Sequence, residues 1–204
     1  MLIVRLNRQQ VDLAVDVLFD AFHEYPVIPY ILGDVGCAYT ERLRALLSYF
    51  VMARIYREEP ILAIRQDDIA VAAAIVTLPG EREIPEEMKV HRESLWHMLG
   101  TEAKKRYERL GQVDDSGATD APHLHLNMIG VRHGHMGRGL ARLLLEEVHK
   151  MSSEDEHSTG VSLTTELQAN IPLYQHFGYR IVGQTQISAN LDSWLFFRPN
   201  SEDE

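Results

Sequence analysis

The sequence predicts a single α/β (α+β) domain in which a mixed β-sheet carries helices on both faces. Three observations lead to this class. The chain of 204 residues is long enough to bury one substantial core. Hydrophobic residues make up 45% of it and charged residues 25%, which is typical of globular proteins. Segments with the period of strands are interleaved with segments of helical period, without an internal repeat, so we expect one domain over 1–204.

In the first half of the chain, apolar residues recur at strand spacing, then at helical spacing, then at strand spacing again. Pro26 and Pro29 end the first helical pattern, and we expect a loop or short helical turns over 25–39. A turn at Asp67-Asp68 separates two strand patterns, which predicts an antiparallel hairpin. The expected elements are a strand over 2–6, helices over 11–22 and 40–56, and strands over 61–64 and 69–78.

The second half begins with a charged, amphipathic stretch over 85–110, which predicts one or two helices broken near Gly100. Residues 111–122 are polar and rich in turn formers, and we expect a mobile loop there. Strand and helix patterns then alternate again. The expected elements are a strand over 124–131, a helix over 137–151, an acidic loop over 152–159, a strand over 160–167, a short helix over 171–177 and strands over 179–183 and 187–197.

Charge and composition narrow the class of partner. The formal net charge of -10 argues against a nucleic-acid binder, which needs a broad basic face. The single cysteine, Cys37, allows no intrachain disulfide and suits a reducing cytoplasm. Residues 1–10 lack the apolar run of a signal peptide, and no segment is apolar enough to span a membrane. We therefore expect a cytoplasmic protein without a nucleic-acid or membrane partner, whether a monomer or a homodimer.

A glycine-rich, cationic loop is the most informative segment of the chain. Glycines at 134, 137 and 139 lie between a strand pattern and a helix pattern, where bare backbone amides and the helix dipole favour an anion. Residues 132–142 hold three arginines, two histidines and no acid. We interpret the loop as a site for a phosphate-bearing ligand; the plainer alternative is a tight strand-to-helix turn. A dinucleotide fingerprint fails because its third glycine would fall at Arg142, and a Walker loop fails because Leu140 and Ala141 follow the last glycine.

A second motif lies downstream, in Asn170…Tyr174…Gly178-Tyr179. Asn170 occupies a good cap position for the short helix. Tyr174 and Phe177 share one helical face, so Tyr174 is also open to a plain packing role.

Together these motifs resemble the GNAT superfamily of N-acetyltransferases. Residues 136–141 match its acetyl-CoA loop, (Gln/Arg)-x-x-Gly-x-(Gly/Ala), except that Met136 replaces Gln or Arg. The downstream motif is similar to the family's Asn-x-x-x-Tyr-x-x-x-Gly-(Phe/Tyr). The resemblance is sharp over 124–179 and weaker over 2–78. It implies a mostly antiparallel sheet of about six to seven strands, with a splay between the strands at 124–131 and 160–167.

The resemblance also implies a cofactor, acetyl-CoA, released as CoA, and assigns residues to it. A backbone amide of the first splayed strand would stabilise the charge on the thioester oxygen. Backbone groups of Ile129 and Val131 would hold the pantetheine arm, Asn170 would contact it, and Tyr174 would protonate the departing thiolate. The Met136 amide would still serve the diphosphate, with Arg138, Arg142, His133 or His135 replacing the missing side chain. The expected cofactor-binding residues are Ile129, Gly130, Val131, Met136, Gly137, Arg138, Gly139, Leu140, Ala141, Arg142, Asn170 and Tyr174.

The general base stays open between two residues. Glu166 lies near the end of the second splayed strand, and His125 shares a face of the first with Asn127. Tyr174, Glu166 and His125 are therefore the candidate catalytic residues, although His123 and His125 could equally be plain strand residues. We expect no metal, because His-x-His supplies only two ligands.

The favoured activity is acetyl transfer to a primary amine of a small molecule or peptide, by direct attack in a ternary complex. The alternative is a non-catalytic acyl-CoA-binding sensor or interaction module on the same scaffold. The acceptor itself has no motif.

Overall fold

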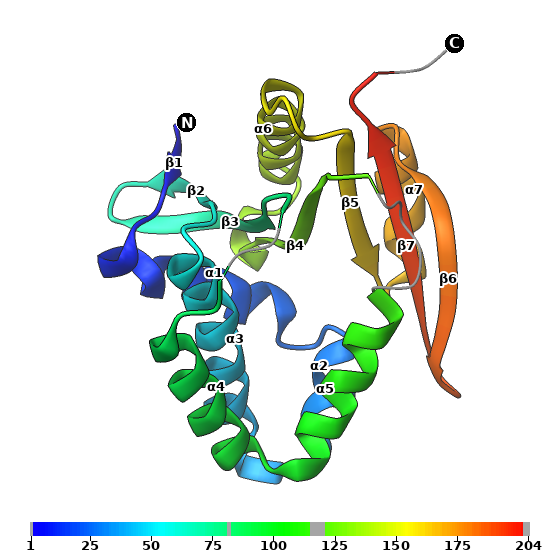
Figure 1. The fold of residues 1–204 in the computed structure, drawn as a ribbon. Coiled ribbons are helices and arrows are strands. Elements are labelled where there is room, and N and C mark those ends of the chain that lie inside the picture. The colour runs from blue at the N-terminus through cyan, green and yellow to red at the C-terminus, as the bar shows by residue number, and fades with distance from the viewer. Residues whose placement is uncertain (1, 81–82, 115–120, 202–204) are drawn as a thin grey trace.

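The computed structural model describes residues 2–80, 83–114 and 121–201, and over 112–114 it describes the backbone only. A single mixed sheet forms the centre of the fold. Within these residues the sheet has seven strands in the order β1-β2-β3-β4-β5-β7-β6. Neighbouring strands are antiparallel except β4 and β5, which run parallel. The predicted fold class is confirmed (Figure 1). The strands are β1 (Ile3–Arg5), β2 (Ile61–Gln66), β3 (Ile69–Thr77), β4 (Leu124–Val131), β5 (Gly160–Thr165), β6 (Arg180–Ser188) and β7 (Leu191–Pro199).

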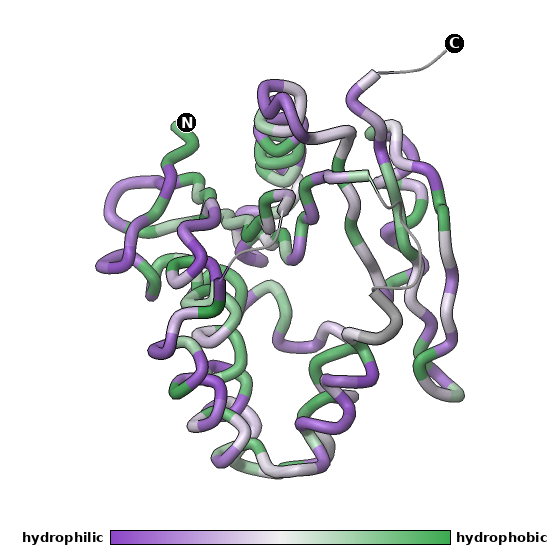
Figure 2. The backbone as a smooth tube through the Cα atoms, viewed as in Figure 1, coloured by the Kyte–Doolittle hydropathy of each residue, from purple (hydrophilic) through white to green (hydrophobic). Residues whose placement is uncertain are grey.

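Helices cover both faces of the sheet and create two separate cores. Alternate residues of β3 enter different cores: Ala73 and Ile75 one, Ala74 and Val76 the other. Burial on both faces explains why this strand is almost continuously apolar. Polar and apolar residues mix along α4, α5 and α6, as expected of helices with one packed face (Figure 2). The first core receives α1 (Val11–Phe22), α2 (Val27–Leu32), α3 (Tyr39–Tyr56), α4 (Glu86–Leu99) and α5 (Thr101–Asp114), and the second receives α6 (Leu140–Glu154) and α7 (Ile171–His176).

Several boundaries differ from the predicted ones, and three of these differences have a clear local cause. The helix expected from 137 begins at Leu140, because Gly137 and Gly139 both adopt φ +74, a left-handed conformation that no α-helix contains. Helix α5 continues to Asp114 into the expected polar loop, since polar residues suit an exposed helical face. The rest of that loop, 115–120, lies outside the described residues. The last hairpin turns at 189–190, later than predicted, because the polar residues over 184–186 belong to an edge strand.

The parallel pair β4–β5 holds together over only three residue pairs. Leu124, His125 and Leu126 pair with Val161, Ser162 and Leu163, and beyond them the two strands separate. This is the predicted splay. A β-bulge in β4 adds to it: Ile75 pairs with Met128 and Val76 with Leu126, so Asn127 is the extra residue. In the described part of the chain, no helix is both long and apolar enough to cross a membrane.

Candidate active site

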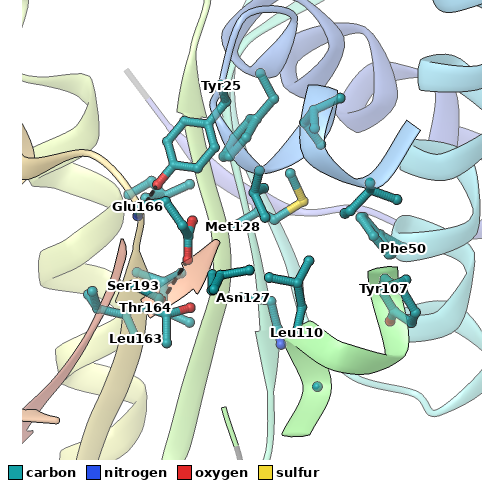
Figure 3. A pocket seen from close by; sticks show the side chains of 18 of the residues that line it. Tyr25, Phe50, Tyr107, Leu110, Asn127, Met128, Leu163, Thr164, Glu166 and Ser193 are labelled. Atoms are coloured by element: carbon teal, nitrogen blue, oxygen red, sulfur yellow. Dashed lines mark hydrogen bonds between the residues drawn. The ribbon is translucent and has the colours of Figure 1, made fainter. Parts of the chain in front are cut away.

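A cavity of about 260 Å³ lies where β4 and β5 separate (Figure 3). Its sheet side is formed by residues of β4 and β5, by Ile187 of β6 and Ser193 of β7, and by Glu166, directly after β5. Helices α1, α2, α3 and α5 line the opposite side, and α7 contributes Tyr174. The end of the short strand pairing thus creates the space, and five helices enclose it.

The open edge of β4 presents backbone groups to the splay. The Arg132 amide donates to the Val71 carbonyl oxygen over 2.9 Å, on the side of β3. Successive amides of a strand point to opposite edges, so the amides of Val131 and Ile129 face away from β3. Two of the backbone groups predicted to hold pantetheine therefore lie on the unpaired edge. Gly130 has a packing role, because a Cβ built on it would lie 2.7 Å from the Ala21 side chain.

Glu166 is the half-buried carboxylate of the cavity. Burial raises its pKa, while hydrogen bonds from Ser193 and Tyr25 oppose the rise. Ser193 Oγ donates to Glu166 Oε1 over 2.9 Å from the neighbouring strand β7. A carboxyl with a raised pKa inside a cleft is suited to proton transfer.

Tyr25 is fixed beside Glu166 by a defined set of hydrogen bonds. Thr165 Oγ1 accepts from the Leu167 amide at 3.3 Å and from Asn170 Nδ2 at 3.1 Å. These donors use both of its lone pairs, so its own hydrogen goes to the Tyr25 hydroxyl, 2.9 Å away. The Glu166 amide also donates to that hydroxyl, at 3.1 Å. The tyrosine hydrogen is thereby left for the Glu166 carboxylate or for a ligand.

Tyr174 and Asn170 of the downstream motif both line the cavity. The Tyr174 ring is buried against Tyr179 and Phe196. Burial, with the Glu166 charge adding to it, raises the pKa of Tyr174 to about 12, so its hydroxyl stays protonated at neutral pH. Asn170 precedes α7 but makes no side-chain cap; its amide nitrogen bonds Thr165 instead.

The glycine loop forms an open cradle at the start of α6. Gly137 and Gly139 have φ +74, and a Cβ built on either would meet no atom within 4 Å. The first amides of any α-helix have no acceptor within the helix, which here concerns Leu140, Ala141 and Arg142. The chain therefore presents several amides to an unobstructed surface, as a diphosphate site requires.

Two arginines of this loop already have partners within the chain, both on the surface: Arg138 donates to the Gly134 carbonyl oxygen at 3.2 Å, and Arg142 pairs with Glu146 at 2.7 Å. The backbone amide of His133 donates to Asp20 Oδ2 at 2.6 Å. The Met136 amide, expected to face the diphosphate, donates to the His133 carbonyl oxygen at 3.3 Å. The cradle is therefore made by the amides after Met136.

His125 lies apart from the other candidate catalytic residues. It is absent from the described cavity lining, and its Nδ1 lies 2.8 Å from Ser162 Oγ on β5. Burial lowers its pKa to about 4, which leaves the ring neutral at pH 7. In the structure, the His125 side chain forms a hydrogen bond between the paired strands β4 and β5.

Sequence reasoning missed Tyr25, Ser193 and the helical wall of the cavity. Tyr25 and Glu166 are separated by 141 residues, and Ser193 and Glu166 by 27. Neither pair has a spacing rule that would reveal it. The bulge at Asn127 was missed as well, because His125 and Asn127 alternate with Leu124 and Leu126 as in a regular strand.

The comparisons with known proteins agree with this geometry. The family described as "Acetyltransferase (GNAT) domain" matches residues 83–193. That is more than half of the chain, and the chain belongs to this family. It is an acetyltransferase by family and fold. No curated protein sequence matches it.

Solved structures share the fold over nearly the whole chain. One, from Corynebacterium glutamicum and described as histone acetyltransferase HPA2 and related acetyltransferase, is 16% identical with a TM-score of 0.72, covering 98% of this chain and 97% of that one. The Drosophila melanogaster polyamine N-acetyltransferase is 17% identical, with a TM-score of 0.62 and coverages of 96% and 97%. The Escherichia coli ribosomal-protein-S18-alanine N-acetyltransferase is 14% identical, with a TM-score of 0.59 and coverages of 100% and 96%.

Proposed function

We propose that this protein transfers an acetyl group from acetyl-CoA to a primary amine held in the cavity. The observation that carries the proposal is the presence of two groups in one cavity: a half-buried carboxyl with a raised pKa, Glu166, and a tyrosine that stays protonated, Tyr174. Amine acetylation needs a base and an acid of this kind.

The residues present fit acetyl-CoA. The amides that open α6 suit its diphosphate, and no side chain obstructs Gly137 or Gly139. The unpaired edge of β4 suits its amide-containing pantetheine arm, which would add to the sheet as a short strand. Acetyl-CoA supplies the activated acetyl group; the remaining chemistry is proton transfer by side chains of this chain.

Glu166 takes a proton from the incoming ammonium, directly or through water, and leaves a nucleophilic amine. Tyr25 and Ser193 hold the carboxylate in place during this step. The nitrogen attacks the thioester carbon, and an amide on the open edge of β4, Ile129 foremost, donates to the carbonyl oxygen as negative charge develops on it. The carbon–sulfur bond breaks, Tyr174 gives its proton to the sulfur, and the second proton of the nitrogen restores the tyrosine.

The test is thiol release from acetyl-CoA across a panel of primary amines, with mass spectrometry of the amide product. Tyr174→Phe keeps the packed ring and removes only the hydroxyl, so we expect kcat to fall about 100-fold, the scale of a general acid. Affinity for CoA should change little.

Tyr179→Phe is the matched control, because Tyr179 is equally buried but bonds His149 outside the cavity. Its kcat should stay near the wild-type value. Acetyl-CoA binding without thiol release for any amine would refute the proposal and favour a non-catalytic acyl-CoA sensor. An unchanged kcat in Tyr174→Phe would remove the acid role from that residue.

A further inference from the structure

The helical wall of the cavity is mainly apolar. Six aliphatic or phenylalanine side chains from α1, α2, α3 and α5 line the cavity opposite the sheet: Phe22, Val27, Ile28, Ile31, Phe50 and Leu110. Tyr107, Glu108 and Gly111 of α5 complete this wall. Met128 of β4 lies between this wall and Glu166 (Figure 3). A ligand whose nitrogen is at Glu166 therefore has apolar surface on its other side.

Charge in the cavity is limited to two carboxylates. Among the lining residues that the structure describes, no lysine, arginine or histidine occurs. Glu166 is half-buried, whereas Glu108 is exposed, and Lys104 Nζ lies 3.7 Å from Glu108 Oε1. A carboxylate on the acceptor would meet no cation among the described lining residues, and a second ammonium against the apolar wall would be a buried charge without a partner, which is costly. Glu108 would receive a second ammonium only at the exposed rim, where an ion pair contributes little.

Contacts between α5 and three other helices, α2, α3 and α4, hold the apolar wall together. The Tyr107 ring stacks on Phe50 with centroids 5.8 Å apart and contacts Trp96 of α4 at 5.0 Å. Arg106 Nε donates to the Ile31 carbonyl oxygen over 2.9 Å and so ties α5 to α2. These contacts join four helices, so the apolar surface is a preformed part of the site.

We propose that the acceptor is a primary monoamine with an uncharged, apolar body, either an alkylamine or an aralkylamine. Its nitrogen lies at Glu166 and its body lies against Phe50, Leu110 and Met128. The cavity of about 260 Å³ is close to the lower end of small-molecule sites. This volume favours a small alkylamine or aralkylamine over a long polyamine or a peptide. The inference rests on the proposed acetyl transfer and names its substrate class.

Three amines of similar length test the inference: heptylamine, hexamethylenediamine and aminocaproate. They end in a methyl group, an ammonium and a carboxylate, so they differ mainly in the charge that meets the wall. Thiol release with the wild-type protein should give a kcat/KM for heptylamine at least about tenfold above the other two, a modest fraction of the cost of an unpaired buried charge. Equal or higher values for the diamine or the amino acid would overturn the inference.

Two variants test which residues determine the preference between heptylamine and the diamine. Leu110→Asp places a carboxylate on the partly exposed end of the wall, and it should lower kcat/KM for heptylamine and raise it for the diamine. Glu108→Gln tests the alternative that Glu108 binds a second ammonium. If the wild-type protein prefers the diamine and this variant lowers kcat/KM for the diamine alone, the second ammonium is assigned to Glu108. If Leu110→Asp does not fold, the three wild-type values still decide.

The outcomes separate this inference from the proposed function. Turnover of the diamine or the amino acid in preference to heptylamine refutes the monoamine inference and leaves acetyl transfer intact. Absence of thiol release with every amine, in a protein that binds acetyl-CoA, refutes the acetyl transfer itself.

Discussion

Glu166 joins the chemistry of the site to the stability of the fold. Its carboxyl is held by Ser193 from β7 and is linked to Tyr25 from the segment before α2, while burial raises its pKa. The protonated form is therefore favoured in the native state. If Glu166 is the base, as proposed, it acts in its ionised form above its raised pKa, and that form contributes less to the stability of the native state than the protonated form.

This linkage predicts opposite pH dependences for activity and stability. The value of kcat/KM should rise with pH through an apparent pKa above 4.5, the ordinary value for glutamate, as Glu166 loses its proton. The same carboxyl binds more protons in the folded than in the unfolded state between its ordinary and raised pKa values. Its contribution to stability is thus lost as pH rises through that window.

Glu166→Gln is the variant that separates these two effects. It should lose the pH-dependent rise in activity, yet be more heat-stable than the wild type at pH 8 and similar to it at pH 4. A pH profile of kcat/KM and melting curves at both pH values would check this. A rising limb that persists in Glu166→Gln would assign the base to another group.

At the scale of elements, the start of α6 depends on left-handed glycines. Gly139 has φ +74 with open space where a Cβ would lie, so a side chain there meets no clash. Replacing it costs about 1–2 kcal/mol through the backbone conformation alone. The functional cost should be larger, because the same position lies in the predicted diphosphate cradle.

Gly139→Glu should therefore reduce affinity for CoA by at least about 100-fold, because its charge opposes the diphosphate at the helix dipole. Calorimetric titration with CoA gives the measurement. Gly80→Glu is a matched control, since Gly80 also has positive φ, +94, and open space around it but lies after β3. Equal losses in both variants, or unchanged affinity in Gly139→Glu, would show that the loop is not the cradle.

Much of the element order follows from local pattern, and the differences have local causes. The period of apolar residues predicted β4 with the bounds that the structure shows, because Leu124 and Leu126 are buried in the second core and Ile129 and Val131 pack against it. The start of α6 was placed too early, because periodicity does not report the sign of φ. Asn170 does not cap α7 as expected, because its side chain donates to the Thr165 hydroxyl instead. Thr165 belongs to β5, so this contact could not be predicted from the local sequence.

At the scale of the whole molecule, the site was only partly predictable. Glu166 and Tyr174 lie in motifs with known spacing, and both line the cavity. Tyr25, Phe50 and Leu110 come from a loop and two helices that precede β4 in the chain, and only the tertiary fold brings them to that strand. The proposed base and acid were therefore among the candidates that the sequence offered, whereas the wall that we infer to select the acceptor was not.

Because β4 and β5 pair over so few residues, a ligand that bridges them should stabilise the entire fold. At acetyl-CoA concentrations of about 100 times Kd, binding to the native state contributes about 2.7 kcal/mol. For a protein of this size that corresponds to a rise in Tm of roughly 5–10 °C. Thermal melting with and without acetyl-CoA measures it. An unchanged Tm at millimolar ligand would mean that the proposed site does not bind it.

The unpaired edge of β4 also has a consequence for inhibition. A sheet normally satisfies every inner strand on both sides, and here one inner strand keeps amides and carbonyls without a neighbouring backbone beyond Leu126. Any slender molecule with amide groups at peptide-like intervals can occupy that edge, even if it carries no nucleotide. Short extended peptidomimetics therefore offer a route to block this protein that does not compete for the glycine loop.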